Sequence, residues 1–164
     1  MNRIIKLIAD SSVILALFGA TFVLGMFTMH GIVNAQPAKF VSVTVTATAI
    51  PANAKSVHIC LWKNKEGFPI CSPTASHHAA AKKSGGKWRV SFSGIPAGTY
   101  AISGFADLNG DGKLNRNIIG MPKEPIGLSV KGQLQGRPKG RPSFSKAAVT
   151  ITSDLAYMLQ FITI

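Results

Sequence analysis

One segment of the chain combines residue types and a spacing that suit a metal ion. From Asp107 to Asn115 the sequence reads Asp-Leu-Asn-Gly-Asp-Gly-Lys-Leu-Asn. In the first part of an EF-hand calcium loop, positions one, three and five face the ion, a glycine allows a sharp bend, and the seventh residue offers its carbonyl. The sequence therefore predicts calcium as a candidate cofactor. The candidate ligands are Asp107, Asn109, Asp111, Lys113 and Asn115.

The loop departs from the calcium pattern at its twelfth position. Ile118 stands where the bidentate acid is expected, and Glu124 can substitute for that acid only from a distance. The alternative is a metal-free loop in which Asp and Asn side chains accept hydrogen bonds from their own backbone. Both interpretations stay open, and any calcium affinity is expected to be weak, on the order of 10⁻⁴ to 10⁻³ M.

Signatures of catalysis are nearly missing. The chain has no Gly-x-Ser-x-Gly motif, and its few carboxylates leave little for acid–base pairs. We therefore predict no catalytic residues and expect a binding or structural role. One alternative is a small hydrolase or carbohydrate-active enzyme that uses the loop from Asp107 to Asn115, and another is a basic protein that binds polyanions.

The basic character of the chain belongs to the part after residue 35. The whole chain has a formal charge of +12, and removal of residues 1–35 leaves 16 basic and 5 acidic residues, a charge of +11. A run without acids near the C-terminus is the candidate polyanion contact: Lys131, Arg137, Lys139, Arg141 and Lys146. Only Phe144 offers a stacking ring there, so we expect an anionic surface or envelope component as partner and no nucleic acid. We expect contact with a membrane only through the N-terminal segment. A solvated loop is the alternative.

The first 35 residues have the layout of an export signal. Arg3 and Lys6 precede the 23 residues from Ser11 to Val33, which contain no Asp, Glu, Lys or Arg, and Ala35 offers a small residue at a cleavage site. We predict a cleaved signal peptide over residues 1–35, with an uncleaved membrane anchor as the alternative, since about 20 apolar residues span a bilayer. Either outcome places residues 36–164 outside the cytoplasm, in the periplasm or secreted.

Two cysteines fit that compartment. Cys60 and Cys71 are the only pair in the chain, and an oxidising envelope permits a bridge between them. Two separately buried thiols are the alternative. The histidines near them show no spacing typical of a metal site.

The elements that must position these residues are strands. From Phe40 to Ala49, Val alternates with Ser and Thr, which indicates a strand with one buried face, and residues 56–62 repeat the pattern. Further strands are expected near residues 75–82, 88–92, 100–106, 147–151 and 155–164, and the 107–145 segment is expected to be a long loop. We predict an all-β fold, a small Ig-like or prealbumin-like β-sandwich of about seven strands in a single domain over residues 36–164, preceded by an N-terminal hydrophobic helix.

Several short motifs follow one another along this domain. They are Glu66-Gly67-Phe68-Pro69, Ile95-Pro96-Ala97-Gly98-Thr99-Tyr100-Ala101, the segment from Asp107 to Leu114, Gly120-Met121-Pro122-Lys123-Glu124, and Pro142-Ser143-Phe144. This combination, over nearly all of residues 40–164, resembles the bacterial domain-of-unknown-function family 2141. The resemblance implies small exported proteins with a prealbumin-like sandwich and no established activity. Asn115 stands where the family often has Asp.

Overall fold

The computed structural model describes residues 37–130 and 142–164. The predicted export segment, residues 1–35, lies outside this part of the chain. Four of the five predicted polyanion contacts also lie outside it: Lys131, Arg137, Lys139 and Arg141. Within the described ranges, no helix is long and apolar enough to cross a membrane.

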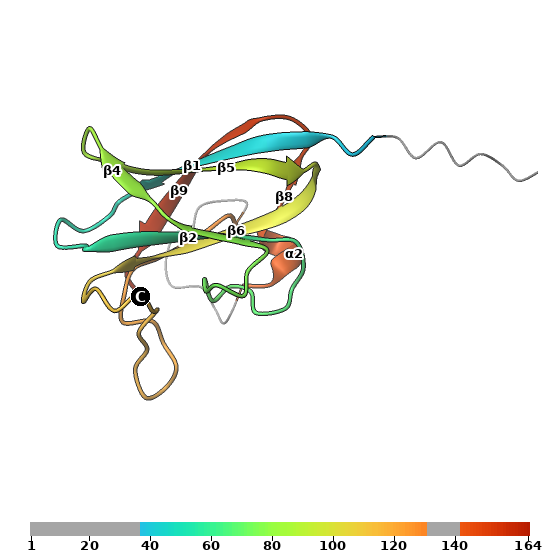
Figure 1. Ribbon diagram of the computed structural model, residues 1–164. Coiled ribbons are helices and arrows are strands. Elements are labelled where there is room, and N and C mark those ends of the chain that lie inside the picture. The colour runs from blue at the N-terminus through green and yellow to red at the C-terminus, as the bar shows by residue number, and fades with distance from the viewer. Residues whose placement is uncertain (1–36, 131–141) are drawn as a thin grey trace, which may run out of the picture. The chain divides into compact units, whose positions relative to one another are not determined.

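The described residues form nine strands and one turn of α-helix (Figure 1). The strands are β1 (Phe40–Thr48), β2 (Ser56–Trp62), β3 (His77–Ala80), β4 (Lys82–Ser84), β5 (Lys87–Pro96), β6 (Gly98–Asp107), β7 (Ile126–Leu128), β8 (Ala148–Ile151) and β9 (Leu155–Ile162). The helical turn is α2 (Phe144–Ala147). The prediction of an all-β domain is confirmed.

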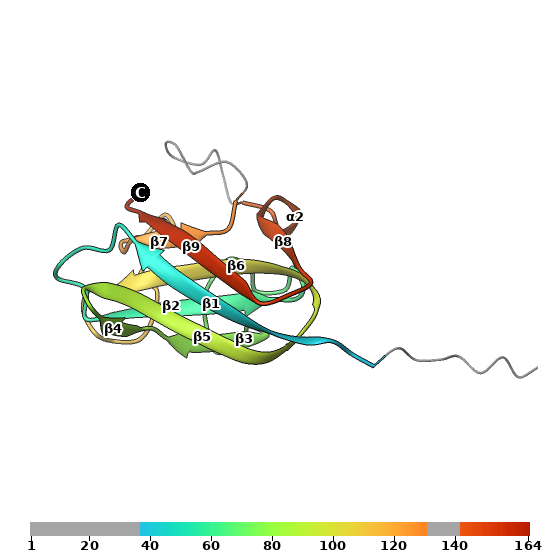
Figure 2. The same ribbon diagram turned by 90° about the horizontal axis from the view of Figure 1, so that it is seen from above.

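Backbone pairing joins all nine strands into one sheet. The order along it is β3-β2-β6-β7-β9-β1-β5-β4, and β8 pairs with β6. β1 and β9 run parallel, and the other pairs are antiparallel. The two ends of this order, β3 and β4, are separated in the chain only by Ala81, so the sheet curves until it is nearly closed (Figure 2).

The expectation of a sandwich of about seven strands is therefore corrected to a nearly closed, barrel-like sheet of nine. The short pairing of β7 with β9, Ile126 opposite Ile162 and Gly127 opposite Phe161, connects what would otherwise be two separate sheets. β7 lies inside the 107–145 segment, which the sequence predicts to be a long loop, and β4 begins at Lys82, the last residue of the strand predicted over 75–82. Both strands have three residues, which is too short for a period to be visible in the sequence.

The core has two parts, one on each face of β2. Val57, Ile59 and Leu61 pack into the main core, where they meet alternate residues of β1 such as Val43 and Val45. The opposite face of β2 is buried as well, under a second cluster made by Cys60, Trp62, Phe68, Cys71 and Phe105. Because both faces of β2 and β6 are covered, the loop that follows β6 starts from a rigid strand.

Candidate functional site

The acidic loop begins at the last residue of β6. The Asp107 side chain is 1% exposed, its Oδ1 accepts a hydrogen bond from the Gly110 N–H at 2.6 Å, and its Oδ2 accepts one from the Gly112 N–H at 2.9 Å. The Ser56 hydroxyl, on the adjacent β2, donates to the same Oδ2 at 3.1 Å. Both oxygens of the first candidate calcium ligand thus hold the loop to the sheet.

These hydrogen bonds also determine the charge of Asp107. Burial by itself would raise the pKa of Asp107, but the hydrogen bonds from Gly110, Gly112 and Ser56 outweigh it and lower the pKa below its usual value, against the opposing charge of Asp111. Asp107 is therefore ionised at neutral pH.

Asp111 accepts hydrogen bonds from the polar groups at the tip of the acidic loop. Its Oδ2 accepts hydrogen bonds from the side-chain amides of Asn109 at 3.0 Å and Asn115 at 2.9 Å, and its Oδ1 accepts one from the Lys113 N–H at 2.8 Å. The hydrogen bonds from Asn115, Asn109 and Lys113 lower the pKa of Asp111. Three predicted ligands are thus within hydrogen-bond distance of one another, with amide N–H groups directed at the carboxylate.

Calcium coordination would require a change in this arrangement. The Nδ2 atoms of Asn109 and Asn115 face Asp111, so both amides must rotate before their Oδ1 atoms can bind a cation. Lys113 contributes its N–H to the loop. The hydrogen bonds are those expected of a metal-free loop. The closeness of the oxygen-bearing side chains to one another is also expected of a calcium loop.

Glu124 closes the loop from the far side. Its side chain is 3% exposed, Oε1 accepts a hydrogen bond from the Leu108 N–H at 2.9 Å, and Oε2 accepts one from the Asn115 N–H at 3.0 Å. A single carboxylate thus joins the two ends of the acidic loop. The sequence shows an acid at this position, but nothing in its spacing indicates that it binds two backbone groups so far upstream.

A hairpin from Asn115 to Lys123 follows the acidic loop. The Lys123 N–H donates to the Asn115 carbonyl at 2.9 Å, and Arg116 and Pro122 form an isolated bridge. The Arg116 guanidinium donates to the Gly120 carbonyl at 2.8 Å across the hairpin. This hydrogen bond holds the guanidinium against the backbone of the hairpin.

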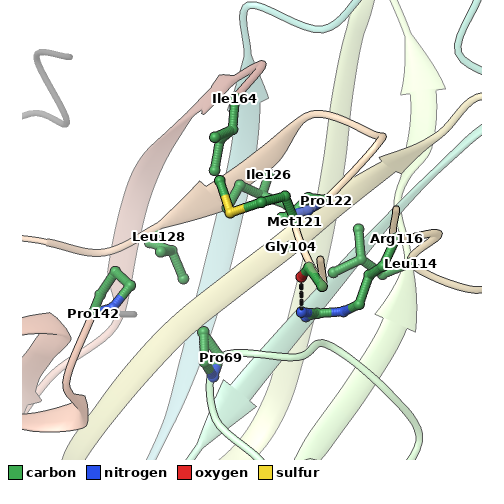
Figure 3. A pocket seen from close by; sticks show the side chains of 11 residues that line it. Pro69, Gly104, Leu114, Arg116, Met121, Pro122, Ile126, Leu128, Pro142 and Ile164 are labelled. Carbon is green, nitrogen blue, oxygen red and sulfur yellow. Dashed lines mark hydrogen bonds between the residues drawn. The ribbon is translucent and has the colours of Figure 1, made fainter. Parts of the chain in front are cut away.

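A cavity of about 240 Å³ lies between this hairpin and the sheet (Figure 3). Its wall is mainly apolar and includes Leu114, Met121, Ile126, Leu128 and Ile164, with Arg116 as its charged member. The sheet contributes Gly104 of β6, where a Cβ would lie 2.7 Å from the His58 carbonyl oxygen and 2.8 Å from the Ile59 side chain. Glycine at this position therefore permits the close packing of β6 on β2 beneath the cavity.

Ser129 fixes the end of β7 beside the cavity. Its hydroxyl donates to the Ala147 carbonyl at 2.6 Å and accepts from the Ile102 N–H at 2.7 Å, so it ties β7 to α2 and β6. Nothing in the sequence marks Ser129 as a functional residue, because a lone serine after a short apolar run has no distinguishing signal.

The family comparison covers this whole region. A family model described as "Uncharacterized protein conserved in bacteria (DUF2141)" matches residues 45–157. The chain belongs to this family. No curated protein and no solved structure matches the chain. The predicted resemblance to family 2141 is confirmed. The description of the family names no activity.

The DUF2141 domain has a second polar group on β2 and β3. Ser56 Oγ lies 3.0 Å from His58 Nε2, and His58 Nδ1 lies 3.2 Å from His78 Nε2. The His58 ring is stacked against the rings of His78 and Phe105, with centroids 5.4 and 4.8 Å away. Burial lowers the pKa of His58, and the charge of His78 lowers it further, while Asp107 and Glu124 oppose the shift. His58 is therefore neutral at pH 7.

The order of these groups differs from that of a nucleophilic triad. In a triad the histidine lies between the serine and the carboxylate, so that it can take the hydroxyl proton. In the DUF2141 domain Ser56 lies between His58 and Asp107 and donates a hydrogen bond to Asp107 Oδ2. Ser56 thus bridges the two side chains, in an order that differs from the serine–histidine–carboxylate order of a triad.

The two cysteines of the domain form a disulfide between Cys60 of β2 and Cys71. Together with His78 they are the only group of three His, Cys, Asp or Glu side chains in the described ranges whose ligand atoms converge. Since both sulfurs are bonded to each other, this group offers a metal only the imidazole. Lys146, the one predicted polyanion contact in the described part of the chain, is exposed on α2.

Proposed function

We propose that this chain is an exported, non-catalytic binding module of the cell envelope, which holds an apolar group of its ligand in the cavity beside the acidic loop. The cavity carries the proposal, because an apolar wall with one fixed cation, Arg116, is the usual composition of a ligand site. Its volume of about 240 Å³ is below the range of roughly 300–1,000 Å³ for drug-sized ligands. A short acyl chain or a single side chain next to an anionic group fits it best.

The hydrogen bonds of the acidic loop support a non-catalytic role. Hydrolysis by a carboxylate pair needs one acid that can donate a proton near neutral pH. Asp107 and Asp111 both have a lowered pKa, so both are ionised and neither suits that task. Each of their oxygens already accepts a hydrogen bond from the loop or from β2.

The test uses hexanoate, which has a short apolar chain and one carboxylate. We expect titration of the ¹⁵N-labelled full-length chain to shift the amide signals of Leu114, Met121, Ile126 and Leu128. Ile126→Trp, which fills the cavity, should abolish these shifts, whereas Met158→Trp on the exposed face of β9 should leave them unchanged. Shifts that are absent, or that persist in Ile126→Trp, contradict the proposal.

Export is supported by the sequence and by the disulfide. Arg3 and Lys6 precede the uncharged run, and Cys60 and Cys71 are bridged, which is typical of proteins in oxidising compartments. Mass determination of the protein recovered from the envelope of an expressing bacterium tests this. We expect a chain that begins at Gln36, and a full-length chain in the cytoplasmic fraction would contradict export.

Calcium binding by the acidic loop is a second candidate function. The observation that favours it is the gathering of Asn109, Asp111 and Asn115 within hydrogen-bond distance of one another. We expect a dissociation constant on the order of 10⁻⁴ to 10⁻³ M, because Ile118 replaces the bidentate acid and Glu124 is already bonded to two N–H groups of the loop. Calcium should shift the amide signals of the loop in the parent protein and not in Asp111→Asn. Identical spectra with and without calcium would remove this candidate.

A further inference from the structure

The hairpin from Asn115 to Lys123 presents two large apolar side chains to solvent. It extends from the body of the domain as the orange loop at the bottom of Figure 1. At its tip, Ile118 is 103% exposed and Ile119 is 77% exposed. Neither side chain contributes to the core, and large apolar groups that protrude together mark an interaction surface.

Several polar backbone groups of the tip are bonded within the hairpin. The Asn117 side-chain oxygen accepts hydrogen bonds from the N–H groups of Ile119 at 3.1 Å and Met121 at 2.9 Å. The Gly120 N–H donates to the Asn117 carbonyl at 2.9 Å, and the Gly120 carbonyl accepts from Arg116. These hydrogen bonds lower the cost of moving the tip into an apolar medium, because the bonded groups lose no hydrogen bond there.

Cations lie along the hairpin and at its base. Lys113, Arg116 and Lys123 are all exposed, and no acidic residue occurs between Leu114 and Lys123. Of the nearest acids, Glu124 is buried and accepts hydrogen bonds from two N–H groups, whereas Asp111 is exposed and accepts three hydrogen bonds within the acidic loop. The three exposed cations outnumber this one exposed carboxylate, so the net charge next to the hairpin is positive.

We propose that this hairpin inserts Ile118 and Ile119 into the surface of an anionic lipid bilayer, with Lys113, Arg116 and Lys123 at the level of the headgroups. Apolar side chains flanked by cations bind such membranes through both burial and electrostatic attraction. A protein partner of acidic character would also suit the cations, but the protruding tip and its internally bonded backbone groups fit a fluid surface better than a preformed groove. This contact shares Arg116 with the wall of the cavity, but Ile118 and Ile119 do not line the cavity.

The experiment places an environment-sensitive label at the tip of the full-length chain, reconstituted in vesicles. The disulfide is left oxidised, and an NBD fluorophore is attached to Ile119→Cys. A matched label is attached to Met158→Cys, which replaces a methionine that is 78% exposed on β9. The vesicles consist of phosphatidylcholine alone or of phosphatidylcholine with phosphatidylglycerol, and they carry a lipid spin label near the headgroup as quencher. Because both labels report locally, the N-terminal segment does not affect the comparison.

In vesicles with phosphatidylglycerol, we expect the label at 119 to shift to the blue and to be quenched, and the label at 158 to remain unchanged. Ile118→Ser should lower the ratio of inserted to free label about tenfold. Lys113→Gln and Lys123→Gln should each lower it about fivefold at low salt. No response at 119, or an equal response in phosphatidylcholine alone, overturns the proposal. A response that needs no lipid and grows with protein concentration also overturns it, because the tip then contacts a second copy of the chain.

Discussion

At the scale of single residues, the acidic loop uses its carboxylates as acceptors for backbone N–H groups. Asp107 and Glu124 are nearly fully buried, and each binds two N–H groups of the loop. Hydrogen bonds to charged acceptors contribute more than neutral ones, and their loss leaves buried donors unpaired. The shape of the loop therefore depends on these two side chains more than on its exposed tip.

Glu124→Ala tests this dependence. The change removes the acceptor for the Leu108 and Asn115 N–H groups, so we expect the free energy of unfolding to fall by about 2 to 4 kcal/mol. Urea unfolding measures it. Glu66→Ala is the matched control, because Glu66 is exposed and its loss should have little effect. Equal stability of the two variants would show that Glu124 does not hold the loop.

At the scale of elements, the alternation of apolar and polar residues predicted the strands that have one buried face and one exposed face. β1 has such a pattern over its whole length, and its predicted limits differ from the observed ones by one residue. β6 is buried at nearly all positions, so its period is weak, and β4 and β7 are too short to show one. The closed, barrel-like form was not predictable, because it depends on the two pairs that join β7 to β9.

The candidate site shows the same limit. Asp107, Asn109 and Asp111 were found by local spacing, because they act within one turn of chain. The hydrogen bonds of Glu124 join residues that are 9 and 16 positions apart in the chain. The contact of His58 with His78 depends on the pairing of β2 with β3, in which Cys60 lies opposite His78. Spacing along one sequence carries no information about that register.

The disulfide gives a prediction at this scale. It ties the segment after β2, which includes the buried Phe68, back to Cys60 in the second core. Replacing Cys60 and Cys71 together by Ala should lower the free energy of unfolding by about 2 to 3 kcal/mol, because the unfolded chain is no longer restricted. Thermal unfolding of the double variant measures this, and a reducing agent should destabilise only the parent protein. Unchanged stability would mean that packing alone holds the segment.

At the scale of the whole molecule, charge and pH act together. The part after residue 35 has a formal charge of +11 with neutral histidines, so each histidine that takes a proton adds to an existing positive charge. Burial lowers the pKa of His58, His77 and His78 in the folded protein. A histidine with a lowered pKa binds fewer protons when folded than when unfolded, so acid favours the unfolded chain.

We therefore expect full stability above about pH 6.5, the unfolded value for histidine, and a loss of stability as the pH falls below it. Urea unfolding between neutral and mildly acidic pH measures the loss. His58→Gln should reduce it, because His58 is shifted by both burial and His78 while Asp107 and Glu124 oppose only in part. Salt distinguishes the two causes, since it screens repulsion between exposed charges but not the burial of an imidazole. The loss that salt removes comes from the net charge. The loss that remains should be smaller in His58→Gln, and His77 and His78 account for the rest. If that variant keeps the whole salt-resistant loss, His58 is not a source of it.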